Sequence, residues 1–207
     1  IGDIRKAGKN MIFVISEDTR KTGSGAPRAI AVSNLSRADS DPIETECDAV
    51  MMSCGTQGVT LQVVSETDNA VIPLTGANEH YTSIRNWGVI EGRDLEAFDV
   101  ATGRRVCLIG QTACAQLFGE RNPLNQTVRV GNLSLKIVGV LESKGVNPLG
   151  MDEDKTLIVP LSIVLRDIMG IREPGVILCS AKSDEEVELA KQQITDLLRQ
   201  RHKIVEG

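Results

Sequence analysis

LTGANEHY at residues 74–81 is the most informative segment of this sequence for predicting the fold. Its first residues are mostly apolar and lead into a glycine, which indicates the end of a strand. The asparagine, or a residue beside it, can cap a helix carrying Tyr81, Ile84 and Trp87, whose spacing of three puts them on one face. Eleven residues later comes the turn motif GRD at 92–94. A strand, a short helix and a turn are therefore expected, and no catalytic motif accompanies them.

The composition limits the kinds of partner that the protein can have. The chain has 207 residues, enough for one large domain or two small ones. Lys and Arg number 23 against 28 Asp and Glu, so the net charge is −5, and no basic stripe is visible. Nucleic acids and anionic membrane surfaces require clustered positive charge, so both are disfavoured as partners. Since aromatic residues are only 2% of the chain, the core must consist mainly of Ile, Val, Leu and Ala.

The apolar runs are too short for a transmembrane helix. The longest, residues 11–15, has the length of a strand, whereas a membrane-spanning helix needs roughly 18 apolar residues. The sequence has neither an initiator Met nor a signal-peptide pattern. We therefore expect a soluble piece of a longer polypeptide.

The N-terminal third predicts strands and one short helix. Residues 11–15 form a β-branched and aromatic run typical of a buried strand. Ser36 followed by Asp39 is a capping pattern, and it indicates a short helix that ends near Glu46. After a further strand, apolar and polar residues alternate on both sides of residues 66–69, which predicts a hairpin.

The C-terminal segment contains the clearest helix of the chain. Residues 176–179 predict a strand, and Ser183 begins a helix with acidic residues in its first turn and basic residues at its end. Both charge placements suit the helix dipole. The apolar residues that fall on one face are Val187, Ala190, Ile194, Leu197 and Leu198.

The middle of the chain differs from the rest in its strand lengths and turn residues, and this difference predicts an inserted block. Its strands are shorter and its turn residues denser, with a strong hairpin signal at Gly131-Asn132. The predicted fold class is α+β: residues 1–87 and 171–207 form a discontinuous subdomain of order β-α-β-β plus a C-terminal β-α. Residues 88–170 form an inserted β-rich subdomain. We expect this insertion not to continue the sheet formed by the two ends.

Nucleotide motifs are missing from the sequence. GSG at residues 23–25 follows a strand, but it lacks the Gly-Lys-Ser/Thr ending of a phosphate loop and is interpreted as a flexible loop. There is also no Gly-x-Gly-x-x-Gly motif of dinucleotide-binding folds. No cofactor is expected.

Candidate catalytic and metal-binding residues find no supporting motif. Cys54, at a predicted strand end, would need a histidine base, and only His80 and His202 exist. A cysteine hydrolase or a small-molecule sensor is thus the hypothesis from another class, and turnover abolished by Cys54→Ala would support it. The acidic run at 152–154 lacks the further ligands of a calcium loop and is interpreted as a solvated turn. We therefore predict no catalytic residue and no metal site.

The terminal histidine and the cysteines have plain structural interpretations. His202 lies between basic residues at a helix end, where it can satisfy carbonyl groups or act as a pH switch. The 5 cysteines are an odd number, so at least one cannot join an intrachain disulfide. Small buried side chains are favoured, and a disulfide involving Cys107 or Cys114 is the alternative.

Several short motifs, taken in order and spacing, resemble the extracytoplasmic core domain of MacB-type, FtsX-like permeases of ABC transporters. One departure is Asn125, where that family commonly has glycine, although asparagine tolerates a left-handed backbone. In chain order the motifs are GKN at 8–10, LSRAD at 35–39, GANEHY at 76–81, EGR at 91–93, VCLIG at 106–110, LFG at 117–119, NPL at 122–124, IVGV at 137–140, IVP at 158–160 and LLRQRH at 197–202.

The resemblance implies a periplasmic domain of an inner-membrane protein with two subdomains, called porter and sabre in that family. The porter would be the two outer segments and the sabre the middle block. The implied function is to couple cytoplasmic ATP hydrolysis to a periplasmic conformational change and to export of small molecules or peptides. The implied partners are a second permease subunit, an ATPase domain or subunit, a periplasmic adaptor and an outer-membrane channel. The domain itself would not be an enzyme.

The same fold also serves lipoprotein-releasing permeases and permeases that regulate cell-wall hydrolases, and this is the alternative function. A lipoprotein releaser needs apolar surface to receive acyl chains, and the sequence shows no long loop rich in Phe or Met. Export is therefore the favoured interpretation. The transported substrate and the residues that contact partners are not predicted.

Overall fold

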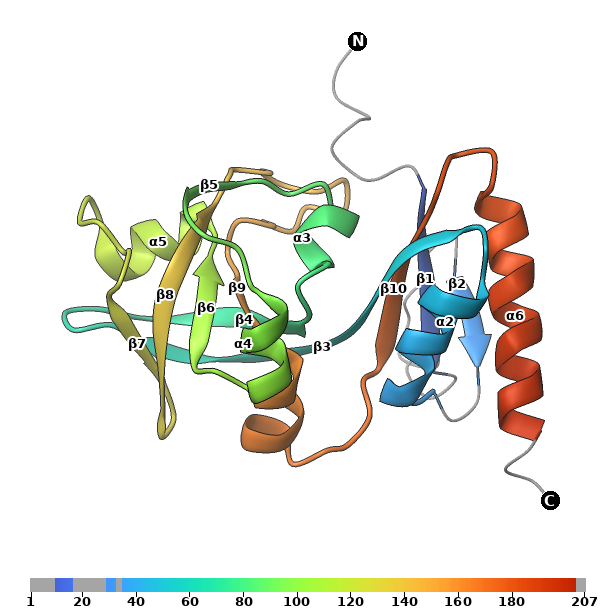
Figure 1. Ribbon diagram of the computed structural model, residues 1–207. Helices are drawn as coiled ribbons and strands as arrows, with labels where there is room; N and C mark the ends of the chain where they lie inside the picture. Colours follow the sequence, from blue (N-terminus) through green and yellow to red (C-terminus); the bar gives the residue numbers. More distant parts are fainter. Residues whose placement is uncertain (1–9, 17–28, 33–34, 204–207) are drawn as a thin grey trace, which may run out of the picture. The chain divides into compact units, whose positions relative to one another are not determined.

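The computed structural model describes residues 10–16, 29–32 and 35–203 of the chain (Figure 1). The predicted loop at 21–28 and the first two residues of the GKN motif lie outside this part. The contacts divide the chain into two compact units. Unit 1 comprises residues 1–56, 84–86 and 172–207, and unit 2 comprises residues 57–83 and 87–171.

Unit 1 is a small sheet covered by helices. Strand β1 pairs with β2 in parallel and with β10 antiparallel, and β10 pairs antiparallel with the first part of β3. Helix α6 packs against α2, β1 and β2. The elements are β1 (Met11–Ser16), β2 (Ala29–Val32), η1 (Arg37–Asp39), α2 (Ser40–Glu46), β3 (Val50–Val64), β10 (Val176–Ala181) and α6 (Val187–Lys203).

The amphipathic pattern explains how α6 joins the core of unit 1. Val187, Ala190, Ile194 and Leu198 are all buried, and they pack with apolar residues of β1 and β10. Leu197, predicted on the same face, is only partly buried and lies at the margin of this core. The prediction of an amphipathic C-terminal helix is confirmed, but the helix begins at Val187 and not at the predicted Ser183.

Unit 2 contains a mixed sheet built from the middle of the chain. Strand β4 pairs in parallel with β9, β9 antiparallel with β6, β6 in parallel with β8, and β8 antiparallel with β5 and β7. The elements are β4 (Asn69–Ala77), α3 (Tyr81–Ile84), β5 (Val89–Gly92), α4 (Ala97–Thr102), β6 (Val106–Ile109), α5 (Gln111–Phe118), β7 (Thr127–Val130), β8 (Leu133–Leu141), β9 (Leu157–Pro160) and the π-helix η2 (Ile163–Met169).

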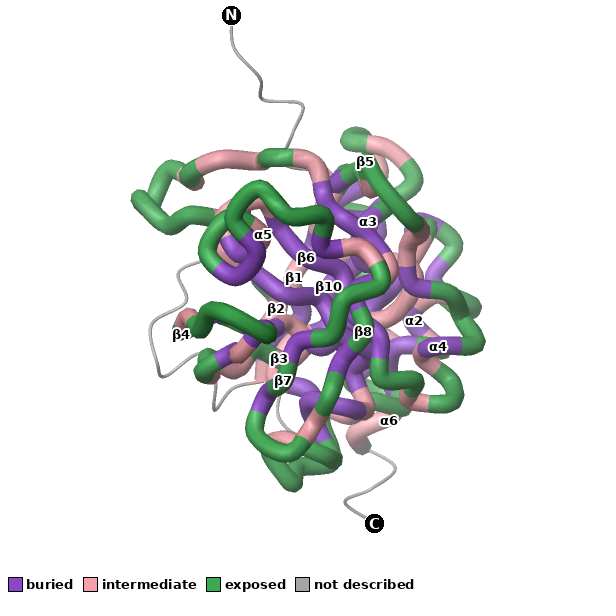
Figure 2. The backbone as a smooth tube through the Cα atoms, turned by 90° about the vertical axis from the view of Figure 1, so that its left-hand side faces the viewer, coloured by how far each residue is buried: buried purple, intermediate pink, exposed green. Residues whose placement is uncertain are grey.

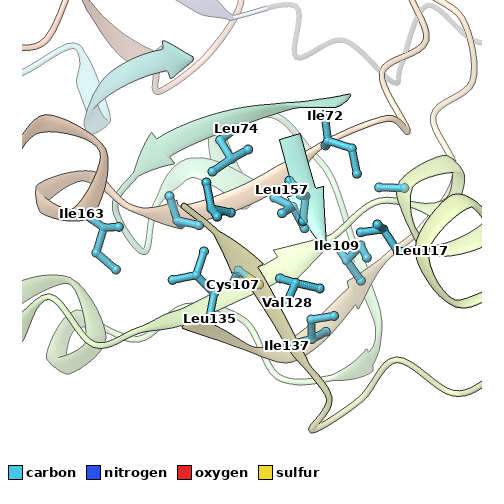
Figure 3. Packing of buried hydrophobic residues seen from close by; sticks show 14 of the residues in the cluster. Ile72, Leu74, Cys107, Ile109, Leu117, Val128, Leu135, Ile137, Leu157 and Ile163 are labelled. Carbon is cyan, nitrogen blue, oxygen red and sulfur yellow. The ribbon is translucent and has the colours of Figure 1, made fainter. Parts of the chain in front are cut away.

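The core of unit 2 is aliphatic, as the composition predicts. Side chains from β4, β6, β7, β8 and β9 meet α5 and η2 in one buried cluster (Figure 3). All four residues of β6 and of β9 are buried, and β6 runs through the buried part of the backbone in Figure 2. Burial on both faces explains their continuous apolar sequences.

Strand β3 is 15 residues long, whereas the sequence predicts two separate strands in this region. Its residues from Val50 to Thr56 pair with β10, and those from Gln57 to Val64 pair with β4. Strand β3 thus links the strands of the two outer segments to those of the middle block in one strand order. This contradicts the expectation that the insertion forms a separate sheet. No residue of β3 pairs with both β10 and β4, so the sheet of each unit uses its own half of the strand.

The division between units therefore differs from the sequence-based one. The sequence assigns residues 1–87 to the outer subdomain, but residues 57–83 belong to unit 2. The reason is that the hairpin of β3 and β4 pairs with β7 and β9, which both come from the middle block. The second boundary, between Ile171 and Arg172, lies within one residue of the predicted one.

Helix α3 is shorter than the sequence predicts. It ends at Ile84, so Trp87 is not part of it. Trp87 is nevertheless buried. Two hydrogen bonds hold it in place: its backbone N–H donates to Thr82 O at 2.8 Å, and its Nε1 donates to Glu142 O at 2.7 Å. The predicted apolar face is formed by a helical turn plus a loop.

Candidate functional site: contacts between the sequence motifs

The motifs LSRAD and LLRQRH, from opposite ends of the chain, meet at Asp39. This carboxylate is 2% exposed. Its Oδ1 accepts a hydrogen bond from Arg201 Nε at 2.9 Å, and its Oδ2 lies 3.1 Å from His202 Nε2. Arg201 also donates to Ala38 O. The last turn of α6 is therefore held by the start of the η1–α2 segment, and we call this contact the Asp39 clamp.

The same carboxylate also starts its own helix. Oδ2 of Asp39 accepts from Ser36 N at 2.8 Å, and Ser36 Oγ accepts from Ala38 N, so the predicted capping box is present. Asp39 thus satisfies an orphan backbone N–H and two basic side chains at once. His202 is a helix-terminal group, as predicted, and its Nε2 contacts a carboxylate oxygen of Asp39.

The described residue of the GKN motif, Asn10, joins the end of strand β10. Its side-chain amide donates to Ala181 O at 2.6 Å, and its own carbonyl accepts from Ala181 N at 2.9 Å. The motif therefore continues the pairing of β1 with β10 beyond the last strand pair.

In unit 2 the motifs EGR and IVGV meet backbone to backbone. A Cβ on Gly92 would lie 2.2 Å from Val138 O, and a Cβ on Gly139 would lie 2.2 Å from Arg93 O. Arg93 N donates to Val138 O at 2.9 Å across this contact. Glycine is required at both positions because any side chain would separate the two backbones.

The arginine of the EGR motif anchors the helix that follows it. Arg93 Nη1 donates to Asp99 Oδ2 at 2.6 Å, and Asp99 also accepts from Glu96 N, which caps α4. Asp99 is fully buried, and Arg104 lies 3.6 Å from its other oxygen. Burial raises the pKa of Asp99, but its hydrogen bonds from Arg93 and Glu96 and the two guanidinium charges outweigh this and lower the pKa overall.

The LTGANEHY segment pairs with the IVP motif. Leu74 to Ala77 run parallel to Leu157 to Pro160 in the β4–β9 ladder. Gly76 lies directly against η2, since a Cβ there would be 2.9 Å from Cβ of Val164. In the turn after β4, Asn78 Oδ1 accepts from His80 N at 3.0 Å, so this asparagine stabilises the turn that leads into α3.

The acidic turn binds the protein's own groups. Asp154 is 4% exposed, and its carboxylate accepts from Ser143 Oγ, Lys144 N and Gly145 N at 2.6 to 3.0 Å. Asp152 accepts from Thr112 Oγ1 at 2.7 Å. In the described ranges, no group of three or more His, Cys, Asp or Glu residues is arranged to hold a metal ion. The interpretation as a solvated turn is wrong for Asp154, which organises the loop from its interior.

The candidate nucleophile Cys54 lies inside the sheet of unit 1. It is fully buried and its Sγ donates to Gly55 O at 3.4 Å. The neighbouring Ser53 donates from Oγ to Ser40 O at 2.7 Å. His80 lies in the turn before α3, 3.8 Å from Glu79, and His202 lies at the Asp39 clamp.

All five cysteines lie in the described part of the chain, and none forms a disulfide there. Four are buried and Cys114 is intermediate. Burial raises the pKa of Cys47 to about 11, helped by Glu46 and Asp48, and burial alone raises the pKa of Cys107 to about 12. These thiols behave as small apolar side chains, as the favoured interpretation holds.

Some contacts of structural residues have no local signal in the sequence. Asp99 could be found from its capping pattern with Glu96, but its ion pair with Arg93 follows from the turn geometry. The sequence pattern predicts that Asp39 is part of a cap, but its contacts with residues 162 and 163 positions away do not follow from spacing.

The fold of this chain is that of extracytoplasmic domains of ABC-type transporters. The periplasmic region of MacB from Actinobacillus actinomycetemcomitans superposes with a TM-score of 0.78 at 23% identity, covering 98% of this chain and 89% of that one. The extracellular domain of the transporter YknZ from Gram-positive bacteria gives a TM-score of 0.70 at 17% identity, with 93% of each chain covered.

Residues 3–197 match the model of the MacB-like periplasmic core domain, and the chain belongs to that family. It is 33% identical over 141 residues to the macrolide export ATP-binding/permease protein MacB of Syntrophobacter fumaroxidans, which covers 68% of this chain and 20% of that protein. It is 26% identical over 205 residues to the MacB of Chlorobium luteolum, covering 99% of this chain and 31% of that protein.

The chain thus spans between about a fifth and a third of the length of the curated relatives that it matches. It is a MacB-like periplasmic domain of an ABC-type transporter permease. No helix in the described ranges combines the length and the apolar character needed to cross a bilayer.

Proposed function

We propose that this domain transmits conformational change in an export permease, coupling ATP hydrolysis at a cytoplasmic ATPase to movement of cargo outside the inner membrane. Relatives are named as macrolide and pyoverdine export ATP-binding/permease proteins, which supports export of small molecules or peptides. The domain itself would catalyse no reaction and bind no cofactor. Its partners would be a second permease subunit, a periplasmic adaptor and an outer-membrane channel.

The observation that carries the proposal is the Asp39 clamp. A domain that transmits force must not yield at its own helix ends. Asp39 fixes the last turn of the longest helix, α6, to the η1–α2 segment through a buried carboxylate with two basic partners. Hydrogen bonds to charged groups are among the strongest in proteins, so a displacement of this helix end would carry the segment with it.

The proposal is tested in the full-length parent permease, reconstituted in vesicles with its adaptor. Asp39→Asn keeps the shape of the side chain but removes its charge. We expect ATP hydrolysis to remain while export per ATP hydrolysed falls severalfold. Glu188→Gln removes only an exposed pair with Lys191 on the same helix and should leave export unchanged.

Two results would contradict this function. Tight binding of ATP to the 207-residue chain alone, measured by fluorescence titration, would place nucleotide chemistry in this domain. A parent polypeptide without any membrane-embedded portion would remove the machine that the domain is proposed to serve.

One observation favours the alternative of a lipoprotein-releasing permease. The loop organised by Asp154 presents three large apolar side chains to solvent: Val146, Leu149 and Met151 are 58 to 82% exposed. Such a surface could receive an acyl chain, although it lacks aromatic residues. A fluorescent fatty acid that binds the chain and is displaced in the Leu149→Asp variant would support this alternative over export.

A further inference from the structure

Strand β3 has one side that is only partly paired. Within residues 57–64, the half of β3 that pairs with β4, the opposite side pairs only with β7, through Val63 and Val64. Strand β7 ends at Val130 because the turn at Gly131 reverses the chain into β8. In the described part of the chain, no further strand pairs with this side between Val59 and Gln62.

Alternate residues of this segment direct their backbone N–H and C=O groups away from β4. Unpaired edges of this kind are templates for another strand, and proteins usually protect them with proline or charged residues. Strand β4 follows this rule: where it extends beyond its pairing with β9, it carries Pro73. The open part of β3, by contrast, reads Val-Thr-Leu-Gln and has neither proline nor charge.

A groove of about 590 Å³ lies along this edge. Both Leu61 and Gln62 line it. Consecutive strand residues point to opposite faces of a sheet, so a groove that reaches both must follow the edge of the strand. Leu133 and Ile168, both partly buried, supply apolar walls from β8 and η2. In Figure 1 the turn between β7 and β8 and the helix before β10 frame this side of β3.

The groove is electrostatically uneven. Asp167 at its wall already accepts hydrogen bonds from Arg166, the shorter at 2.7 Å. Arg129, also at the wall, has no ion-pair partner among the described residues and is exposed. The surplus charge of the groove is therefore positive, which favours a negatively charged group in whatever occupies it.

We propose that the edge of β3 at residues 59–62 is a docking site for an extended segment of a partner protein, which adds a strand beside β3. Its backbone pairs with β3, one apolar side chain enters the groove between Leu133 and Ile168, and an acidic side chain meets Arg129. Strand addition of this type takes affinity from main-chain hydrogen bonds and specificity from pockets for alternate side chains. This inference goes beyond the proposed function and does not depend on it.

The experiment uses the 207-residue chain and two capped hexapeptides of alternating valine and threonine, one carrying a single glutamate and the other a lysine in its place. NMR titration gives affinity, and amide hydrogen exchange locates the peptide. We expect saturable binding of the glutamate peptide with slowed exchange at residues 59–62. The lysine peptide should bind about fivefold more weakly, the range of one partly exposed ion pair.

Three variants distinguish the contribution of the β3 edge to peptide binding from the contribution of the groove's charge. Arg129→Glu should reverse the preference between the two peptides, because it reverses the charge of the groove. Thr60→Lys places a charge on the open strand and should weaken both peptides about tenfold. Val71→Lys is the matched control, since Val71 is 56% exposed on the neighbouring strand β4, and it should leave binding unchanged.

Three outcomes would overturn the proposal. The first is that neither peptide binds the wild-type chain. The second is that protection appears on β4 at residues 69–73 instead of on β3. The third is that the edge amides are already protected without peptide in a concentration-dependent dimer, since the occupant would then be a second copy of this chain.

Discussion

Gly92 and Gly139 show how close backbone contact dictates residue type in this domain. Each would place a Cβ 2.2 Å from a carbonyl oxygen of the facing segment, so the identity of both residues is fixed by the pairing of the EGR turn with β8. Gly92 also has φ +76°, whereas Gly139 is not among the glycines with positive φ. At Gly139 the demand is therefore purely steric.

Gly139→Ala tests this steric demand. The added methyl group meets backbone, which cannot move aside as a flexible side chain can, so the free energy of unfolding should fall by about 3 kcal/mol. Gly58→Ala is the control, because a Cβ there meets nothing within 4 Å. Urea denaturation measures both, and equal stability of the two variants would contradict the explanation.

The lowered pKa of Asp99 makes a pH-dependent contribution to stability. Because the carboxylate binds its proton less readily in the folded state, its contribution is present above the unfolded pKa of about 3.9 and is lost as the pH falls through the lower folded pKa. Asp99→Asn should lower the free energy of unfolding by about 2 kcal/mol at pH 7, the range for hydrogen bonds to charged groups.

Denaturation at pH 7 and pH 3 measures this contribution. The difference in free energy of unfolding between wild type and Asp99→Asn should be smaller at pH 3 than at pH 7. Asp68→Asn, which removes an exposed partner of Arg121, should show no such narrowing. A constant difference for Asp99→Asn at both pH values would mean that packing, not charge, holds α4.

At the scale of single elements, the Asp39 clamp governs the end of α6. Asp39→Ala removes the acceptor of Arg201 and His202, and should destabilise the last helical turn by about 2 kcal/mol. Hydrogen exchange should then speed up at residues 199–202 more than at residues 188–194. Glu188→Ala removes only an exposed ion pair. The free energy of local opening obtained from hydrogen exchange should therefore change by less than about 0.5 kcal/mol.

Elements whose cause is local were predictable from sequence. The run at Met11 forms β1, Gly131 and Asn132 turn the chain between β7 and β8, and Ser36 caps the predicted helix. Elements shaped by distant partners were not predictable to the same degree. Strand β3 continues through Gly55 and Gly58 because β10 and β4 pair with its two halves, and α4 depends on the ion pair of Asp99.

At the scale of the whole molecule, each unit has its own core. The buried cluster of β6, β8 and β9 contains only residues between Val63 and Val164, and the cluster around α6 contains only residues of unit 1. Independent cores are the usual sign of parts that can fold alone. The shared strand β3 is the exception to this separation.

Residues 57–171, expressed alone, should therefore fold. We expect a cooperative urea transition and dispersed NMR amide signals, because every member of the unit 2 core cluster is retained. A matched fragment, residues 70–171, lacks the β3 half that pairs with β4 and should be less stable. If the 57–171 fragment is unfolded, unit 2 also depends on the first half of β3, and the two units do not fold independently.

The family, the aliphatic cores, the amphipathic C-terminal helix and the local turns could all be predicted from the amino-acid sequence, because each follows from short-range patterns of apolar, capping and turn residues. Three features became visible only in the folded chain: where the units divide, that Asp39 holds Arg201 and His202, and that no described strand except β4 pairs with residues 59–62 of β3. These features depend on which distant strands and side chains come together, and the spacing of residues along one chain does not predict such contacts.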